Sequence, residues 1–535
     1  MAKSQPFYAS CSGGLALHMS KFDLLTNPGL AIRLRNFEIS LKGGYRRING
    51  FELFGGESST RPNSDHSVYG VYPYALGLVA VVGSGVYYSE DGISWIQVNR
   101  NAPTGLTETN LALAAELDRP DQSQAQFVLA RGTDGYTTLD YGVLYIASGN
   151  AKLAHFHIDG TGSGRTFHYF EISTPSTAKW MAEVDQHLCI VEDSSSSTRS
   201  TVHYSNTSDF DDFTGVGSGS IAVTKNIEGI KSFRNTLYVF SQNGITKIEN
   251  LNDPSSTTAT DVADRLGCIS GYSIAEIGGD LIFLSMDGLR SVAATTRIDD
   301  VELGNVAPGI TPLLQEFTAE INSYIVSSCV ISSKNQYRIF FMDTGSNARG
   351  FCGTLVTNND GSRGYQWSEL RDIDVRSITC GPDIYGNQVT YHGDDFGHIF
   401  RHDYGNSFNG NKIRAEWRSP DTHLGDLGMR KTLLYIKPSI TREDELDLKL
   451  AISFEDNNTR IRGPSPIDIV NSDGAYLIGE AIIGSFIFGG AIQTLDKINL
   501  QGSGNTVAFT FYSNNTTAPY TLNGYHLEFI PSGRR

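Results

Sequence analysis

The sequence predicts an all-β protein, built as an irregular β-propeller of six or seven blades followed by a C-terminal antiparallel β-sandwich. Composition is the first observation: among 535 residues there are 56 glycines, 25 tyrosines and 27 phenylalanines, but only 17 prolines. Many glycine turns between aromatic and β-branched runs favour strands. The second observation is a recurring apolar hairpin with glycine at its tip. The third is a change of pattern near the C-terminus, where apolar and polar residues alternate.

The hairpins share one arrangement, in which an apolar run ends in serine and a Gly–aliphatic pair follows two residues later. It is clearest in "NTLYVFSQNGITKIEN", which turns at Gly244, and in "GDLIFLSMDGLRSVAA", which turns at Gly288. With the weaker copies, the tips recur at roughly 44 to 64 residues, close to the length of a propeller blade. A closed ring leaves only short strand edges exposed, whereas an isolated blade cannot bury both faces. The alternative is a set of unrelated hairpins in stacked sandwiches. The weaker copies turn near Gly85, Gly149, Ser196, Gly345 and Gly397.

We expect three segments: an N-terminal arm with the first strands at 1–60, the propeller at 61–412, and the sandwich at 413–535. Strands such as "LDLKLAISF" and "YTLNGYHLEFIP" alternate between polar and apolar residues, as in an antiparallel sandwich. One helix is expected inside the propeller, in "PGITPLLQEFTAEIN", with Thr311 as its N-cap and Pro312 at its first position.

Charge and targeting features narrow the function classes. The formal net charge of -16 argues against a surface that binds nucleic acid throughout, but it suits a protein that surrounds DNA and lets it slide. Six scattered cysteines predict free buried thiols. The N-terminus has no apolar signal region. The apolar run "YLIGEAIIGSFIFGGAIQ" contains Glu480 and several glycines, so we expect two buried strands there and no membrane span.

Two histidine-rich stretches are the best candidates for metal ligands. "YHGDDFGHIFRHD" is dense in imidazoles and carboxylates, which could bind zinc or iron. In a strand-turn-strand, however, its aspartates would form a polar turn and its histidines would divide between two faces. His155 and His157 share a strand face but lack an assignable third ligand. We therefore expect no metal and no cofactor. The residues of the first stretch are His392, Asp394, Asp395, His398, His402 and Asp403.

Catalytic motifs are missing from the sequence. "SEDGISW", from Ser89 to Trp95, resembles the Asp-box turn of sialidase-like propellers, although Gly92 directly follows Asp91. That turn is a folding motif, in which the aspartate accepts turn amides and the tryptophan packs between strands. No phosphate-binding loop, nucleophile elbow, HExxH or dinucleotide fingerprint is present. We expect no enzymatic activity.

A basic turn stands out near the N-terminus of this acidic chain. The stretch "LRNFEISLKGGYRRINGF" and the two residues before it contain five basic residues against one acid, Glu38. Arginine forks are favoured at contacts with carboxylates, so the cluster is a candidate for docking onto an acidic surface. The alternative is a solvated strand-turn-strand. The candidate interface residues are Arg33, Arg35, Lys42, Tyr45, Arg46 and Arg47.

Several of these motifs resemble the tail proteins of bacteriophages. "GGLALHMSKFDLLTNPGLAIRLRNFEISLKGGYRRINGF" is similar to an N-terminus that recurs among them. The middle of the chain resembles the nozzle proteins of short-tailed phages, also called packaged-DNA stabilisation proteins or tail tubular protein B. The matching stretches are "IEGIKSFRNTLYVFSQNGITKIE", "GYSIAEIGGDLIFLSMDGLRSV", the helix after Pro308 and "YQWSEL" around Trp367.

The resemblance implies a structural virion protein, assembled in the host cytoplasm and located in the tail. About six copies would form a homo-oligomeric ring below the portal and adaptor, with tail fibres or spikes as further partners. The ring would be a conduit and gate for retention and ejection of genomic DNA, which would pass without specific binding. The alternative function is a propeller at the distal end of the tail that binds a host glycan or receptor.

A second contact is expected in the apolar segment 479–490. An exposed glycine-rich apolar loop would suit an inter-subunit or tip contact. The candidate residues are Ile483, Phe486 and Phe488.

Overall fold

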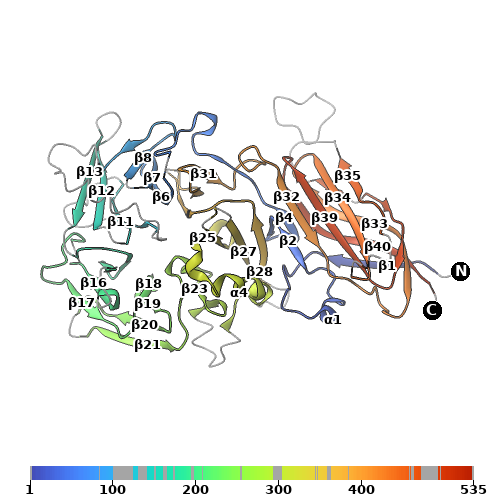
Figure 1. Ribbon diagram of the computed structural model, residues 1–535, viewed down its shortest axis with the longest axis horizontal. Helices are drawn as coiled ribbons and strands as arrows, with labels where there is room; N and C mark the ends of the chain where they lie inside the picture. Colours follow the sequence, from blue (N-terminus) through green and yellow to red (C-terminus); the bar gives the residue numbers. More distant parts are fainter. Residues whose placement is uncertain are drawn as a thin grey trace.

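The computed structural model of the chain describes residues 3–99, 124–130, 141–292, 304–471 and 492–532, with short gaps at 65, 84, 150–151, 161–164, 173–174, 194–197, 208, 254–255, 344, 346–347, 358–362, 384, 457, 459–462 and 495. Strands dominate, and they form a ring of small sheets joined to a second β domain (Figure 1). The predicted fold class, a β-propeller with an additional antiparallel β domain, is confirmed.

Within the described residues, six small sheets stand in a ring as propeller blades. Each is antiparallel, with neighbouring strands joined in chain order. The first three blades contain β6 (Val68–Tyr74), β7 (Gly77–Val82), β8 (Gly85–Ser89) and β9 (Ile96–Gln97); β10 (Gln126–Ala130), β11 (Val143–Ala147), β12 (Leu153–Asp159) and β13 (Thr166–Ile172); and β14 (Trp180–Val184), β15 (His187–Val191), β16 (Thr201–Tyr204) and β17 (Gly219–Ala222). The others contain β18 (Ile227–Phe233), β19 (Thr236–Ser241), β20 (Gly244–Glu249) and β21 (Thr258–Asp264); β22 (Ala275–Ile277), β23 (Asp280–Ser285) and β24 (Gly288–Ser291); and β29 (Ser377–Pro382), β30 (Gln388–Gly393) and β31 (Ile399–His402).

A further sector of the ring belongs to a larger sheet. β25, the first strand of a nine-stranded sheet, packs between β22 and β29. The predicted hairpins are the second and third strands of the six blades and of this sector. The sequence pattern therefore located every sector of the ring. The strands of this sector are β25 (Ile325–Ile331), β26 (Gln336–Met342), β27 (Ala348–Thr357) and β28 (Arg363–Arg371).

The ring is closed by a strand from the other end of the chain. β5 (Phe51–Leu53) pairs with β31 and supplies the outer strand of the last blade, with Phe51 opposite His402. β6 of the first blade then packs on β29 of the last. The last blade therefore cannot be completed without the N-terminal segment.

The second domain consists of two antiparallel sheets whose apolar faces share one core. In the described part of the chain, one sheet has eight strands and the other continues the nine-stranded sheet beyond β28. The first contains β3 (Phe37–Ile39), β4 (Tyr45–Arg47), β40 (Tyr520–Ser532), β33 (Arg430–Arg442), β36 (Ile492–Thr494), β1 (Gln5–Ser10), β37 (Ile498–Asn499) and β38 (Ser503–Gly504). The second adds β2 (Arg33–Arg35), β32 (Ile413–Arg418), β39 (Val507–Asn515), β34 (Leu446–Phe454) and β35 (Ile467–Asn471).

Residues 1–60, expected as an arm, are distributed over both parts of the molecule. β1 and β4 pair with β40, β3 pairs with β4, and β2 joins β28 to β32. A single apolar core extends from Leu284 in the propeller through Trp367 to Phe529 in the second domain. Both termini lie at the end of the second domain that is remote from the ring (Figure 1). The two parts are thus joined by shared strands and by shared core.

The predicted helix is present, but its start differs from the prediction. A 3₁₀ turn (Pro308–Ile310) leads into α4 (Thr311–Thr318), so Thr311 is the first helical residue and Ile310 is the N-cap. The Thr311 hydroxyl donates to the Ala307 carbonyl at 2.9 Å instead of accepting a helix amide. Phe317 of α4 stacks on Phe341 with 4.5 Å between ring centroids. The other α-helix in the described residues is α1 (Lys21–Leu24).

Two further predictions concern thiols and membrane spans. All six cysteines are free; five are buried and Cys380 is half-buried, which confirms the prediction of free thiols. No helix in the described residues is long and apolar enough to span a membrane.

Candidate functional site

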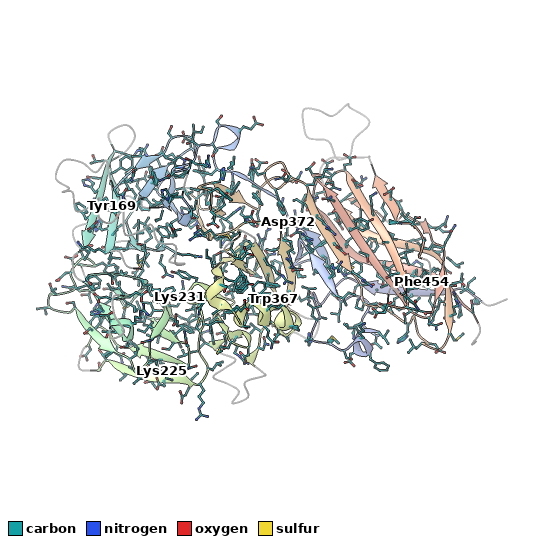
Figure 2. All side chains as sticks on the ribbon, in the orientation of Figure 1. Tyr169, Lys225, Lys231, Trp367, Asp372 and Phe454 are labelled. Atoms are coloured by element: carbon teal, nitrogen blue, oxygen red, sulfur yellow. The ribbon has the colours of Figure 1, made fainter. Side chains whose placement is uncertain are left out.

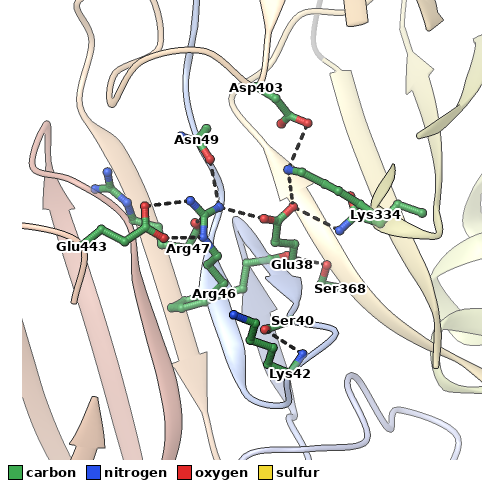
Figure 3. A network of polar contacts seen from close by, with 12 residues as sticks. Glu38, Ser40, Lys42, Arg46, Arg47, Asn49, Lys334, Ser368, Asp403 and Glu443 are labelled. Atoms are coloured by element: carbon green, nitrogen blue, oxygen red, sulfur yellow. Dashed lines mark hydrogen bonds and ion pairs between the residues drawn. The ribbon is translucent and has the colours of Figure 1, made fainter. Parts of the chain in front are cut away.

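The basic turn lies at the junction between the propeller and the second domain, and acidic residues of the same chain surround it (Figure 3). Arg33 and Arg35 are on β2, a strand that pairs with β28 of the propeller and β32 of the second domain. Arg33 pairs with Glu416 at 2.7 Å, and Arg35 pairs with Asp372 at 2.6 Å. Both acids are distant in sequence from the arginines that they neutralise.

Glu38 is the centre of the junction and only 4 % exposed. One of its carboxylate oxygens accepts from Arg46 at 2.8 Å. The other accepts from Lys334 at 2.9 Å, Gln336 at 3.1 Å and Arg338 at 3.3 Å. Burial of Glu38 raises its pKa, but the nearby Lys334, Arg338 and Arg46 outweigh burial and hold the pKa below its ordinary value.

Two more carboxylates complete this network. Asp403 accepts from Arg338 at 2.8 Å and from Lys334 at 3.2 Å. Glu443 accepts two hydrogen bonds from the guanidinium of Arg46, at 2.7 and 3.0 Å. The network therefore balances its charges, and it connects β3 and β4 with the propeller on one side and with the end of β33 on the other (Figure 3). We call these residues the junction network: Glu38, Arg46, Lys334, Arg338, Asp403 and Glu443.

Two of the predicted interface residues, Tyr45 and Arg47, have buried side chains. The Tyr45 hydroxyl donates to the Gly29 carbonyl at 2.8 Å and accepts from the Gly14 amide at 3.1 Å. Arg47 is fully buried and donates to Asn515 at 2.9 Å and to the Thr517 carbonyl. Because both side chains are enclosed by their own chain, neither can contact another subunit.

The structure therefore reduces the number of residues that could dock onto another protein. Arg35, Arg46 and Arg47 were expected to bind an acidic surface of a neighbouring subunit. Instead, each of them donates to acceptors of its own chain. Arg33 keeps 54 % of its side chain exposed, and Lys42 lies on the surface at the turn. These two residues remain candidates for contact with another protein. The other proposed contact, Ile483, Phe486 and Phe488, lies outside the described residues.

The histidines of "YHGDDFGHIFRHD" are divided among separate interactions. His392 and His402 are buried, with 3.1 Å between their Nδ1 atoms. Asp394 accepts the amides of Phe396 and His398 at 2.8 Å each, so it shapes the turn. Asp395 pairs with Arg376, and Asp403 belongs to the junction network.

His155 and His157 form a hydrogen-bonded chain on β12. His155 Nδ1 lies 2.9 Å from Asp211, and its Nε2 lies 2.8 Å from His157 Nδ1. The carboxylate must accept from Nδ1, so a neutral His155 accepts from His157 through Nε2. Asp211 also accepts from Tyr145 at 2.9 Å, which ties the second blade to the third. No group of three or more histidine, cysteine, aspartate or glutamate side chains in the described chain is placed to hold a metal ion.

The Asp-box-like turn has the structural role expected for it. Asp91 accepts the amides of Ile93 and Ser94 at 2.8 and 2.9 Å, and these hydrogen bonds lower its pKa. Trp95 donates to the Thr60 carbonyl at 3.1 Å and packs on Phe54.

A polar cavity of about 560 Å³ lies on the axis of the propeller, and sequence reasoning missed it. Its wall comes from β6, β10, β14, β18, β22, β25 and β29, the innermost strands of the ring. Three charged side chains line it, Glu183, Lys231 and Glu276, together with Tyr72 and Phe127. Figure 2 labels Lys231 within the ring. In the sequence, these three charged residues lie on three separate strands. That pattern could not predict a cavity, because it does not show that the strands meet around one axis.

A comparison with protein-family models and with curated proteins found no match to this chain.

Proposed function

We propose that this protein is a structural subunit of a bacteriophage tail nozzle. About six copies would form a ring below the portal and adaptor and would continue the channel through which DNA is retained and released. The observation that carries the proposal is the position of the stretch that resembles phage tail proteins. That stretch, 13–51, supplies β2, β3, β4, the first residue of β5 and two members of the junction network.

A subunit of a channel that retains packaged DNA has to resist the force of that DNA, so its two domains must keep a fixed relative orientation. Here the shared apolar core, the shared strand β2 and the junction network connect the propeller to the second domain. Buried charges are costly unless they are fully paired, so this arrangement also fixes one relative orientation of the two parts. Both features support a rigid ring subunit.

The charge supports passage of DNA without specific binding. The chain carries 58 acidic and 42 basic residues, and much of the basic excess near the N-terminus is neutralised at the junction. A wall of negative charge repels phosphates, and a duplex can then slide along it. Arg33 and Lys42, which remain accessible, are proposed to contact the adaptor or a neighbouring subunit.

Electron microscopy of the protein mixed with a portal–adaptor complex tests this function. We expect an added ring of density below the adaptor, coaxial with the portal channel. A complex without such a ring, or binding only at the distal end of a complete tail, would contradict the nozzle and favour a receptor-binding propeller. A variant with Arg33→Glu and Lys42→Glu is expected to weaken attachment, whereas Lys225→Glu, in the connection between β17 and β18 of the propeller, is the matched control.

A further inference from the structure

The axial cavity of the propeller is lined by three charged side chains that are not paired within the described chain. In the described part of the chain, the side chains of Glu183, Lys231 and Glu276 make no hydrogen bond or ion pair, and all three are exposed to solvent. They come from β14, β18 and β22, three adjacent sectors of the ring, so they converge from one side of the cavity. Burial raises the pKa of Glu183 and lowers that of Lys231, although Glu276 partly offsets the latter. All three side chains nevertheless remain exposed to solvent, so a ligand in the cavity can reach them.

An aromatic surface faces the same space from another sector. Tyr72 of β6 and Phe127 of β10 line the cavity and stack on each other, with 5.4 Å between centroids and 25° between planes. The cavity volume lies in the range of small-molecule sites, about 300 to 1,000 Å³, and such sites combine apolar walls with a few convergent polar groups.

The mixture of charges determines the class of ligand. An anion would meet two carboxylates, and a cation would leave the ammonium of Lys231 unpaired. Hydroxyl groups satisfy both kinds of partner, because each can donate to a carboxylate and accept from an ammonium. The non-polar face of a sugar ring can cover the Tyr72–Phe127 pair at the same time.

We propose that the axial cavity binds an uncharged saccharide of one or two rings. Glu183 and Glu276 accept from its hydroxyl groups, Lys231 donates to them, and Tyr72 and Phe127 support the ring. The site goes beyond the nozzle proposal and does not depend on it, since ligand binding and ring assembly are measured separately.

Calorimetric titration of the whole chain with glucose, galactose, N-acetylglucosamine, maltose and lactose tests the site. We expect saturable binding of at least one of them, and at least a tenfold weaker affinity in Lys231→Met and in Glu276→Gln. Lys247→Met is the matched control, because Lys247 is on the same blade but pairs with Glu249 outside the cavity. Its affinity should equal that of the unmodified protein.

Circular dichroism decides whether each variant is folded, and Glu183→Gln replaces any variant that is not. Absence of saturable binding by all five sugars would overturn the proposal. So would binding that survives all folded cavity variants. Binding of glucosamine or glucuronate alone, without binding of the neutral sugars, would overturn the assignment to an uncharged ligand.

Discussion

Replacing Glu38 with glutamine is expected to lower the free energy of unfolding by about 3 to 5 kcal/mol, the usual cost of breaking a buried ion pair from one side. The substitution keeps the shape of the side chain but removes its charge. Arg338, which is fully buried, would then share Asp403 with Lys334 as its remaining carboxylate. Arg46 would keep Glu443 on its other side. Two buried or half-buried cations would thus be under-neutralised at once.

Urea denaturation at pH 7.5, followed by tryptophan fluorescence and circular dichroism, measures this loss. The matched control is Asp264→Asn, which removes the acid of an exposed pair with Lys225, 2.8 Å apart. Exposed pairs contribute little, so this change should lower the free energy of unfolding far less than Glu38→Gln does. A Glu38→Gln protein as stable as the control would show that the junction network does not hold the two domains together.

Acidification from pH 6.5 to pH 4 is expected to destabilise the propeller through its buried histidines. Burial lowers the pKa of His402 from 6.5 to about 4 and that of His392 well below 6.5. Burial and the nearby His155 and His168 lower the pKa of His157 to about 4. In this pH interval, these histidines therefore bind protons in the unfolded chain but not in the folded chain. Stability is fully present above pH 6.5 and is lost as the pH falls toward 4.

The expected loss from His402 alone is about 3 kcal/mol, because each pKa unit corresponds to about 1.4 kcal/mol. The pKa of Asp403 is lowered by Arg338 and Lys334 in spite of burial, so Asp403 remains ionised in this interval. Urea denaturation at several pH values should show a shallower dependence for His402→Gln than for the unmodified protein. His18→Gln, on the exposed surface, is the control. Identical profiles for all three proteins would contradict the assignment.

The propeller was predictable because its signals are local. A two-residue turn such as that between β19 and β20 places glycine at a fixed distance from an apolar run, and each blade repeats this within one stretch of sequence. Binary alternation likewise identified β34 and β40 of the second domain. Thr311 was misplaced as an N-cap because the 3₁₀ turn ahead of α4 has no strong sequence signature.

The contacts between residues that are distant in the sequence could not be predicted. The basic turn was recognised as unusual, but its partners Glu416, Asp372 and Glu443 are hundreds of residues away, and 58 acids offered no way to choose among them. The strand from 51 to 53 that closes the ring, and the cavity on its axis, likewise depend on which distant segments meet. Sequence reasoning therefore found the elements and their order, and the assembled chain was needed to show what the charged residues contact.

The mass of the purified protein in solution, measured by native mass spectrometry alone and with a portal–adaptor complex, tests the nozzle proposal most directly. The proposal predicts a ring of about six times the 58.4 kDa of the chain, formed alone or on the adaptor. A protein that stays a monomer under both conditions would contradict it.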